Sequence, residues 1–170
     1  MQSHEEFMRL ALAEAQKALA AGEFPVGCVF VYRGEVVARG HRLNSTAAAV
    51  NEIDHAEISA LRELIANRPA LRRDEIIVYS TMEPCLMCYA TLLLNGIRTI
   101  VFGYEDVMGG GTDLPLAQLR PLYREMRVTV VPHILRADCW RLHKKFFENP
   151  ENSYWRDSSL AKFTLGVGRT

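Results

Sequence analysis

Two cysteines three residues apart, Cys85 and Cys88, are the first candidates for chemistry in this sequence. One helical turn would bring both sulfurs to the same side, and the amides of a helix N-terminus would favour their thiolate forms. Together with the imidazole of His55 they make three ligands that suit Zn²⁺. Three protein ligands leave a fourth position for water, which is typical of a catalytic zinc site rather than a structural one.

Glu57 supplies a carboxylate two residues after His55. Such a carboxylate could take a proton from a zinc-activated water and pass it to a leaving group. Zinc lowers the pKa of its water from ~15.7 to ~7, so hydroxide would be available at neutral pH. Attack on an amidine-like ring carbon, followed by proton delivery to the exocyclic nitrogen, would release ammonia. These residues therefore predict hydrolytic deamination.

Two other interpretations of the cysteine pair compete with this one. A thioredoxin-like redox pair would account for the two cysteines but not for the His-Ala-Glu sequence at 55–57. A structural zinc site would need a fourth ligand. The available candidates for that ligand are Cys28, Cys139, His41, His133 and His143. Cys28 lies in an apolar strand and Cys139 on a helix, where a free cysteine usually behaves as a small buried hydrophobe.

The elements that must position these residues alternate between helices and strands. A first helix follows Ser3, with Glu6 in capping-box position, and ends at Gly22. Pro84 fits the first position of a later helix. Strands are predicted at 26–31, 36–39, 76–79, 99–102 and 128–131, the first two as an antiparallel hairpin, and further helices at 55–66, 84–94, within 114–123 and at 138–148. The order predicts an α/β fold, a three-layer α/β/α domain over residues 1–148 with a mixed five-stranded sheet.

Length and composition restrict the class of protein. The chain has 170 residues, of which 49% are hydrophobic and 24% charged, as expected for one globular domain. Twenty basic residues balance twenty acidic ones, which disfavours a uniformly basic nucleic-acid binder. No run approaches the ~18 apolar residues that span a bilayer. No membrane association is expected, and without a secretory signal pattern we expect a cytoplasmic location.

The combination H-x-E followed by P-C-x-x-C is the signature of zinc deaminases. The sequence thus resembles the cytidine-deaminase-like superfamily from about Phe7 to Phe147. The segments 25–27 (Pro-Val-Gly), 56–58 (Ala-Glu-Ile) and 83–88 (Glu-Pro-Cys-Leu-Met-Cys) are most similar to bacterial tRNA adenosine deaminases and guanine deaminases. The resemblance implies one Zn²⁺ per subunit on His55, Cys85 and Cys88, with Glu57 as the catalytic proton shuttle. It also implies a homodimer.

The same resemblance implies five substrate-binding residues. Asn44 stands eleven residues before the zinc histidine, where these families place a base-reading amide; its alternative role is to turn the loop. Val26 and Ala56 belong to the matching segments, and Asp106 follows a Phe-Gly pair as in the adenosine deaminases, unless it only forms a turn. Trp155 lies in the tail 149–170, a candidate lid over the active site, or packs on the surface or at a dimer interface.

The substrate is the least determined part of this prediction. The zero net charge and the aromatic tail favour a free nucleobase or a nucleoside, while the Gly-Phe-Asp-Asp segment of guanine deaminases is absent. The alternative is adenosine-to-inosine deamination of tRNA, for which phosphate contacts would be needed. An alternative of another class is a catalytically silent zinc-binding module that associates with a partner, and the presence of Glu57 argues against it.

Overall fold

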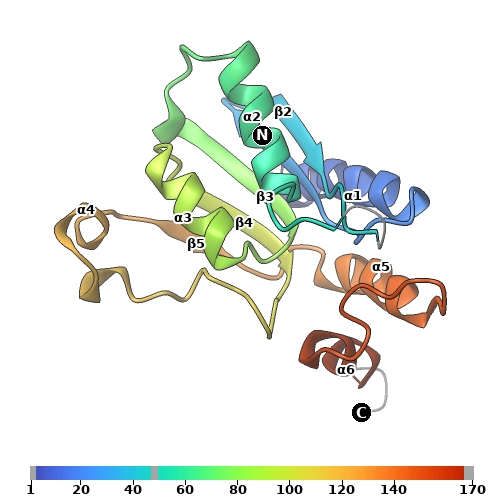
Figure 1. The fold of residues 1–170 in the computed structure, drawn as a ribbon. Helices are drawn as coiled ribbons and strands as arrows, with labels where there is room; N and C mark the ends of the chain where they lie inside the picture. The colour runs from blue at the N-terminus through green and yellow to red at the C-terminus, as the bar shows by residue number, and fades with distance from the viewer. Residues whose placement is uncertain (1–2, 47–49, 167–170) are drawn as a thin grey trace.

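A mixed five-stranded sheet forms the centre of the molecule (Figure 1). The computed structural model describes residues 3–46 and 50–166. The strand order is β2-β1-β3-β4-β5; β1 is antiparallel to both β2 and β3, whereas β3, β4 and β5 run parallel. The strands are β1 (Gly27–Tyr32), β2 (Glu35–His41), β3 (Ile76–Met82), β4 (Thr99–Tyr104) and β5 (Thr129–Val131). The predicted hairpin and mixed sheet are confirmed.

Helices cover both faces of this sheet, as predicted for a three-layer fold. On one side α1 (His4–Ala20) packs against β1 and β3 and against α5 (Arg136–Glu148). On the other, α2 (Ala56–Asn67) packs against β1, β2 and α3 (Leu86–Leu94). In Figure 1 α2 and α3 lie in front of the sheet and α1 behind it. This arrangement places the starts of α2 and α3 next to one another.

The region predicted to hold a helix within 114–123 is less regular than expected. It contains a 3-10 turn, η2 (Leu116–Gln118), and the single helical turn α4 (Pro121–Arg124). Another 3-10 turn, η1 (Arg73–Glu75), precedes β3. Pro115 and Pro121 interrupt the segment, and proline lacks the amide hydrogen that a longer helix would need. No helix in the described part of the chain is both long and apolar enough to cross a membrane.

Close backbone contacts fix the positions of α1 and α2 on the sheet. A Cβ atom on Gly27 of β1 would lie 2.2 Å from the carbonyl oxygen of Ala11 in α1. A Cβ on Gly40 of β2 would lie 2.3 Å from the carbonyl oxygen of Ala56, the first residue of α2. Only glycine allows so close an approach. The start of α2 is therefore seated directly on β2.

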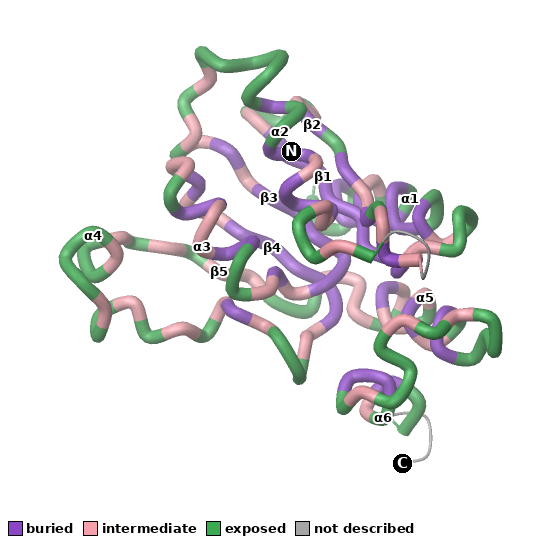
Figure 2. Tube along the Cα trace, in the orientation of Figure 1, coloured by how far each residue is buried: buried purple, intermediate pink, exposed green. Residues whose placement is uncertain are grey.

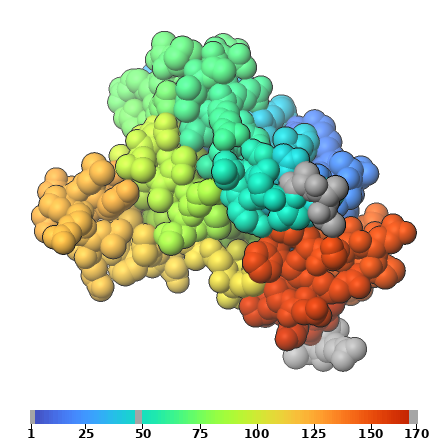
Figure 3. Space-filling model, viewed as in Figure 1, coloured from blue at the N-terminus to red at the C-terminus, as the bar shows by residue number. Residues whose placement is uncertain are grey.

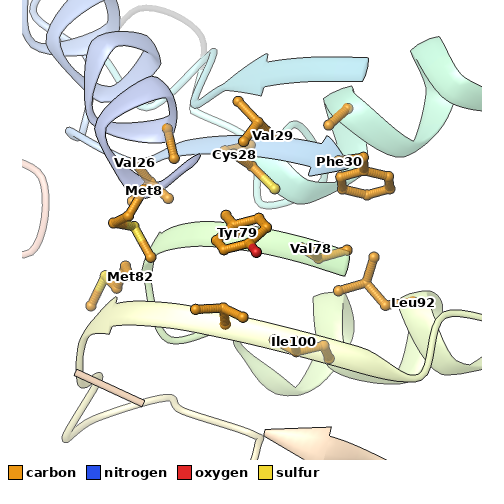
Figure 4. Close-up of a cluster of buried hydrophobic side chains, with 14 of the residues drawn as sticks. Met8, Val26, Cys28, Val29, Phe30, Val78, Tyr79, Met82, Leu92 and Ile100 are labelled. Atoms are coloured by element: carbon orange, nitrogen blue, oxygen red, sulfur yellow. The ribbon is translucent and has the colours of Figure 1, made fainter. Parts of the chain in front are cut away.

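One continuous core joins the sheet to its helices (Figure 2). Figure 4 shows side chains of β1, β3 and β4 packed together with Met8 of α1 and Leu92 of α3. Cys28 and Cys139 are fully buried within this core, as predicted. Neither belongs to the group of side chains that could hold a metal ion.

The segment after α5 packs against the domain. Its helix α6 (Ser159–Gly166) contacts α5, and Leu160 and Ala161 join the core. The indole nitrogen of Trp140 donates to the carbonyl oxygen of Thr164 at 2.9 Å, and the hydroxyls of Tyr104 and Thr164 lie 3.0 Å apart. These contacts hold α6 against α5 and β4.

Candidate active site

The two halves of the zinc-deaminase signature meet where α2 and α3 begin. His55 is the residue before α2, and Cys85 is the residue before α3; both have an extended backbone. Pro84 was predicted to occupy the first position of α3, and this is wrong, because the helix begins at Leu86. The backbone of Cys85 instead forms a β-bridge with Gly110, which keeps it extended. Cys85 thus points into the site from the turn, and Cys88 from the first helical turn.

His55, Cys85 and Cys88 form a group that can hold one metal ion. Nδ1 of His55 lies 3.5 Å from Sγ of Cys85 and 3.4 Å from Sγ of Cys88, and all three ligand atoms lie within 4.8 Å of one another. A tetrahedral zinc ion with ordinary bond lengths places its nitrogen and sulfur ligands about 3.6 Å apart. Both nitrogen–sulfur distances therefore match those of a tetrahedral zinc site.

The three side chains of this group share protons with one another. A hydrogen bond from Cys88 lowers the pKa of Cys85, to about 4, so Cys85 is the thiolate of the pair. The hydrogen bond to Cys85 and burial raise the pKa of Cys88. Burial lowers the pKa of His55, but the hydrogen bond with Cys85 and the charge of Glu57 outweigh it and raise the pKa to about 9. A metal ion would replace these shared protons.

Glu57 lies in the first turn of α2 and is 3% exposed. Its Oε1 accepts a hydrogen bond of 3.0 Å from the hydroxyl of Ser80, which is buried on β3. Burial raises the pKa of Glu57, and the nearby charge of Cys85 raises it further. A carboxylate with a raised pKa is a better proton acceptor, as general base catalysis needs.

A cavity of about 220 Å³ lies in front of these residues. It is lined by Phe24, Val26, Arg42, Glu52, His55, Ala56, Glu57, Met82, Glu83, Cys85, Asp106, Met108, Gly109, Tyr154, Trp155 and Leu160. Of the five predicted substrate-binding residues, four are in this set: Val26, Ala56, Asp106 and Trp155. The cavity is smaller than the ~300–1,000 Å³ of pockets for drug-sized ligands, and this favours a single flat ring as its occupant.

Asn44 is placed differently from the other four. Its side-chain amide donates to the carboxylate of Asp54 at 2.7 Å, and the residue does not line the cavity among the described residues. Its backbone is left-handed, with φ 55°. Asn51 donates to the same carboxylate oxygen at 2.9 Å, so the two amides together tie the loop to the residue before His55.

Glu83 and Asp106 shape the wall of the cavity next to Cys85. The carboxylate of Glu83 accepts hydrogen bonds from the amide of Asp106 at 3.1 Å and from the amide of Thr112 at 3.3 Å. Asp106 in turn accepts from the amide of Gly109 at 2.9 Å. Burial raises the pKa of Asp106. The 106–112 loop is therefore anchored to the turn that carries the first cysteine.

The C-terminal segment forms another wall. Tyr154, Trp155 and Leu160 line the cavity, and in Figure 3 this segment, in red, lies next to the cyan part of the chain that precedes α2. Trp155 has φ 53° and is 45% exposed, so its ring lies at the mouth rather than in the core. These three residues of the C-terminal segment therefore form part of the cavity wall.

Several residues of the site had no role in the sequence analysis. Ser80 gave a usable signal, because it and Thr81 are polar residues in a largely apolar, buried strand. Arg42 and Glu52 gave none, since each is an ordinary charged residue in a polar loop or at its edge. Tyr154 gave none either, because its contact with Glu52 joins residues 102 positions apart.

The sequence matches the family described as the cytidine and deoxycytidylate deaminase zinc-binding region over residues 1–104. The chain belongs to this family. It is a zinc-binding deaminase, an enzyme that acts on C–N bonds, and His55, Cys85 and Cys88 form a group that could hold its metal ion.

Three relatives of this deaminase carry names that refer to tRNA. It is 36% identical to a tRNA-specific adenosine deaminase of Streptococcus pyogenes serotype M18, over 83% of this chain and 87% of the relative. It is 33% identical to that of Bacillus subtilis, over 86% and 90%. A subunit of the tRNA-specific adenosine deaminase of Schizosaccharomyces pombe is 34% identical over 85% of this chain, which spans only 37% of that relative.

Solved structures show the same fold. A structure from a study of A-to-I editing by tRNA deaminases at the wobble position of transfer RNA superposes with a TM-score of 0.66 at 27% identity, covering 81% of this chain and 98% of that one. A guanine deaminase from Bacillus subtilis gives a TM-score of 0.54 at 28% identity, covering 61% and 66%. A guanine deaminase from Nitrosomonas europaea, 20% identical with a TM-score of 0.68 over 86% of this chain and 85% of that one, shares the fold.

Proposed function

We propose that this deaminase converts adenosine to inosine in tRNA. The observation that carries the proposal is the set of relatives 33–36% identical over more than four-fifths of the chain, which are named tRNA-specific adenosine deaminases. The charge balance favoured a free base or nucleoside, but a total of zero does not prevent a local basic surface from binding RNA. The relatives therefore favour the tRNA alternative.

The arrangement of residues supports a hydrolytic reaction. Zinc held by His55, Cys85 and Cys88 would supply a water nucleophile near neutral pH. We propose that Glu57 takes a proton from that water and delivers it to the exocyclic nitrogen of the base. A carbon–oxygen bond forms at the ring carbon, the carbon–nitrogen bond breaks, and the nitrogen leaves as ammonia. Val26 and Ala56 would hold the ring in place from the cavity wall.

A base inside a nucleic acid must leave its stack to reach this cavity. Deaminases that act on polynucleotides accept a single-stranded or extruded base for this reason. A cavity of about 220 Å³ that opens beside the exposed Trp155 suits one such base. Trp155 would then lie near the nucleotide to which the bound base belongs.

A second candidate is deamination of a free base or nucleoside. It is favoured by the placement of Tyr154, Trp155 and Leu160 in the cavity wall, because an enclosed site suits a small ligand. A cytoplasmic location and a homodimer remain predictions under either candidate.

Ammonia release distinguishes the two candidates. The zinc-loaded protein is supplied in parallel with total tRNA, adenosine, adenine, guanine and cytosine. We expect release from tRNA alone, with tRNA binding that weakens steeply as salt rises, since phosphate contacts release counterions. Turnover of a free base with no turnover of tRNA would instead establish the second candidate.

A further inference from the structure

Glu52 links the C-terminal segment to a residue of the metal group. Its Oε2 lies 3.2 Å from Nε2 of His55, the ring nitrogen opposite Nδ1. Nδ1 is the atom that faces both cysteines. One imidazole therefore faces the metal group with one nitrogen and a carboxylate with the other.

Glu52 is held in place although its side chain is 52% exposed. The hydroxyl of Tyr154 donates to its carboxylate, 2.9 Å from Oε2 and 3.1 Å from Oε1. Nη2 of Arg42 lies 3.3 Å from Oε2. Two polar groups from different parts of the chain thus fix one surface carboxylate, which would otherwise be free to rotate.

Arg42 is itself buried and held by several contacts. Its side chain is 2% exposed, and its guanidinium donates to the carbonyl oxygens of Leu43 at 2.5 Å and Asn51 at 2.7 Å. Its Cζ lies 5.6 Å from the centre of the Tyr154 ring. Glu52 is its only ion-pair partner within the described residues. A buried guanidinium needs such a partner, so Arg42 and Glu52 hold each other.

We propose that Glu52 is a positioning residue for the metal ligand His55, and that Tyr154 acts on the metal group through Glu52. A carboxylate that accepts a hydrogen bond from Nε2–H of a histidine fixes its tautomer, so that the lone pair of Nδ1 is available to the metal. It also fixes the plane of the ring and makes the ligand more basic. The C-terminal segment thereby contributes to metal affinity as well as to the cavity wall.

Zinc affinity without substrate tests this proposal. Wild-type protein, Glu52→Gln and Tyr154→Phe are each loaded with zinc and titrated with a chromogenic chelator. We expect about 10–100-fold weaker zinc binding for Glu52→Gln, the usual effect of losing such a partner, and a smaller loss for Tyr154→Phe. Glu148→Gln, which removes the same charge from an exposed helical residue far from the metal group in sequence, is the matched control and should bind zinc like the wild type.

The double variant tests whether Tyr154 acts through Glu52. In the Glu52→Gln background, Tyr154→Phe should weaken zinc binding no further, because residues that act in one network are not additive. Additive losses would overturn the role of Tyr154. Zinc affinity of Glu52→Gln equal to that of the wild type would overturn the role of Glu52. The absorption spectrum of the Co²⁺-loaded variants should keep its thiolate bands, which shows that both cysteines still bind the metal.

These readouts do not depend on any substrate. The proposal rests on the metal group alone, so a failure of tRNA deamination would leave it standing. Conversely, normal zinc affinity in every variant would overturn the role of Glu52 but would not bear on the proposed deamination of adenosine in tRNA.

Discussion

Ser80 on β3 donates a hydrogen bond of 3.0 Å to Oε1 of Glu57 on α2, and both side chains are buried. The bond crosses from the sheet to the helix that covers it. It holds one carboxylate oxygen, so the carboxylate cannot rotate freely in the cavity. A base that must accept a proton and then release it at another atom needs this kind of fixed orientation.

Glu57→Gln should therefore remove activity without removing the metal. The amide has nearly the shape of the carboxylate but cannot carry the proton, so ammonia release should fall by about 100-fold or more. Zinc content, measured by mass spectrometry of the metal, should stay at the wild-type level. Glu63→Gln on the same helix is the control and should keep full activity. An unchanged rate in Glu57→Gln would remove Glu57 from the mechanism.

Loss of Cys88 should have a different effect from loss of Cys28. Both side chains are fully buried, but only the sulfur of Cys88 belongs to the metal group. Cys88→Ala should purify without zinc and unfold at a lower temperature, since metal binding stabilises the folded state. Cys28→Ala should keep its zinc and lose only packing. Equal zinc content in the two variants would contradict the assigned ligands.

Gly40→Ala should disturb the site from a distance. The added methyl group would lie 2.3 Å from the carbonyl oxygen of Ala56 and 2.6 Å from the amide nitrogen of Ala60, so α2 must shift. Overpacking of this kind costs about 1–3 kcal/mol of unfolding free energy. Because His55 and Glu57 lie at the start of α2, activity should fall together with stability. Urea unfolding measures the stability and ammonia release measures the activity. Gly166→Ala is the control, because its methyl group would meet open space, and it should change neither.

His143 makes stability depend on pH. Its Nδ1 lies 3.0 Å from the carbonyl oxygen of Cys139, its Nε2 has no partner in the described part of the chain, and the rings of Phe24 and Tyr104 pack against it. Burial lowers its pKa to about 4 in the folded protein, from 6.5. Between these values the unfolded chain binds a proton that the folded chain excludes. His143 therefore favours the folded state fully above pH 6.5, and this advantage is lost as the pH falls towards 4.

The variant His143→Phe isolates this effect. The wild type should lose about 3 kcal/mol more unfolding free energy than the variant on going from pH 7 to pH 4, which corresponds to the shift in pKa. Urea unfolding at several pH values measures both slopes. Parallel slopes for the two proteins would show that His143 does not titrate as described.

Local patterns were sufficient to predict much of the fold. The alternation of apolar runs with helical periodicity predicted the mixed sheet and its covering helices, and the capping box of Ser3 and Glu6 is present. The spacing of the two cysteines, with His55 preceding them, predicted the metal group, because each half of the motif lies at a helix start. Two places differ: the segment 114–123 is less regular than the predicted helix, and a β-bridge between Cys85 and Gly110 delays the helix predicted from Pro84 by two residues.

Contacts between distant segments could not be predicted in this way. Nothing in the local sequence indicates that Tyr154 contacts Glu52. That contact depends on how the segment between α5 and α6, which contains Tyr154, folds back onto the domain. The placement of Asn44 depends equally on tertiary structure: its left-handed backbone and its bond to Asp54 direct the amide to the loop. The spacing in the sequence can select Asn44 as a candidate, but it cannot predict the direction in which the side chain of a loop residue points.

The central claim is hydrolytic deamination of adenosine in tRNA, and isotope labelling tests it most directly. The zinc-loaded protein is incubated with tRNA in water enriched in the heavy oxygen isotope, and the tRNA is then digested to nucleosides for mass spectrometry. We predict inosine that carries one heavy oxygen atom, formed in equal amount to the ammonia released, and none with Glu57→Gln. Absence of inosine from tRNA, or inosine without the label, would contradict this account.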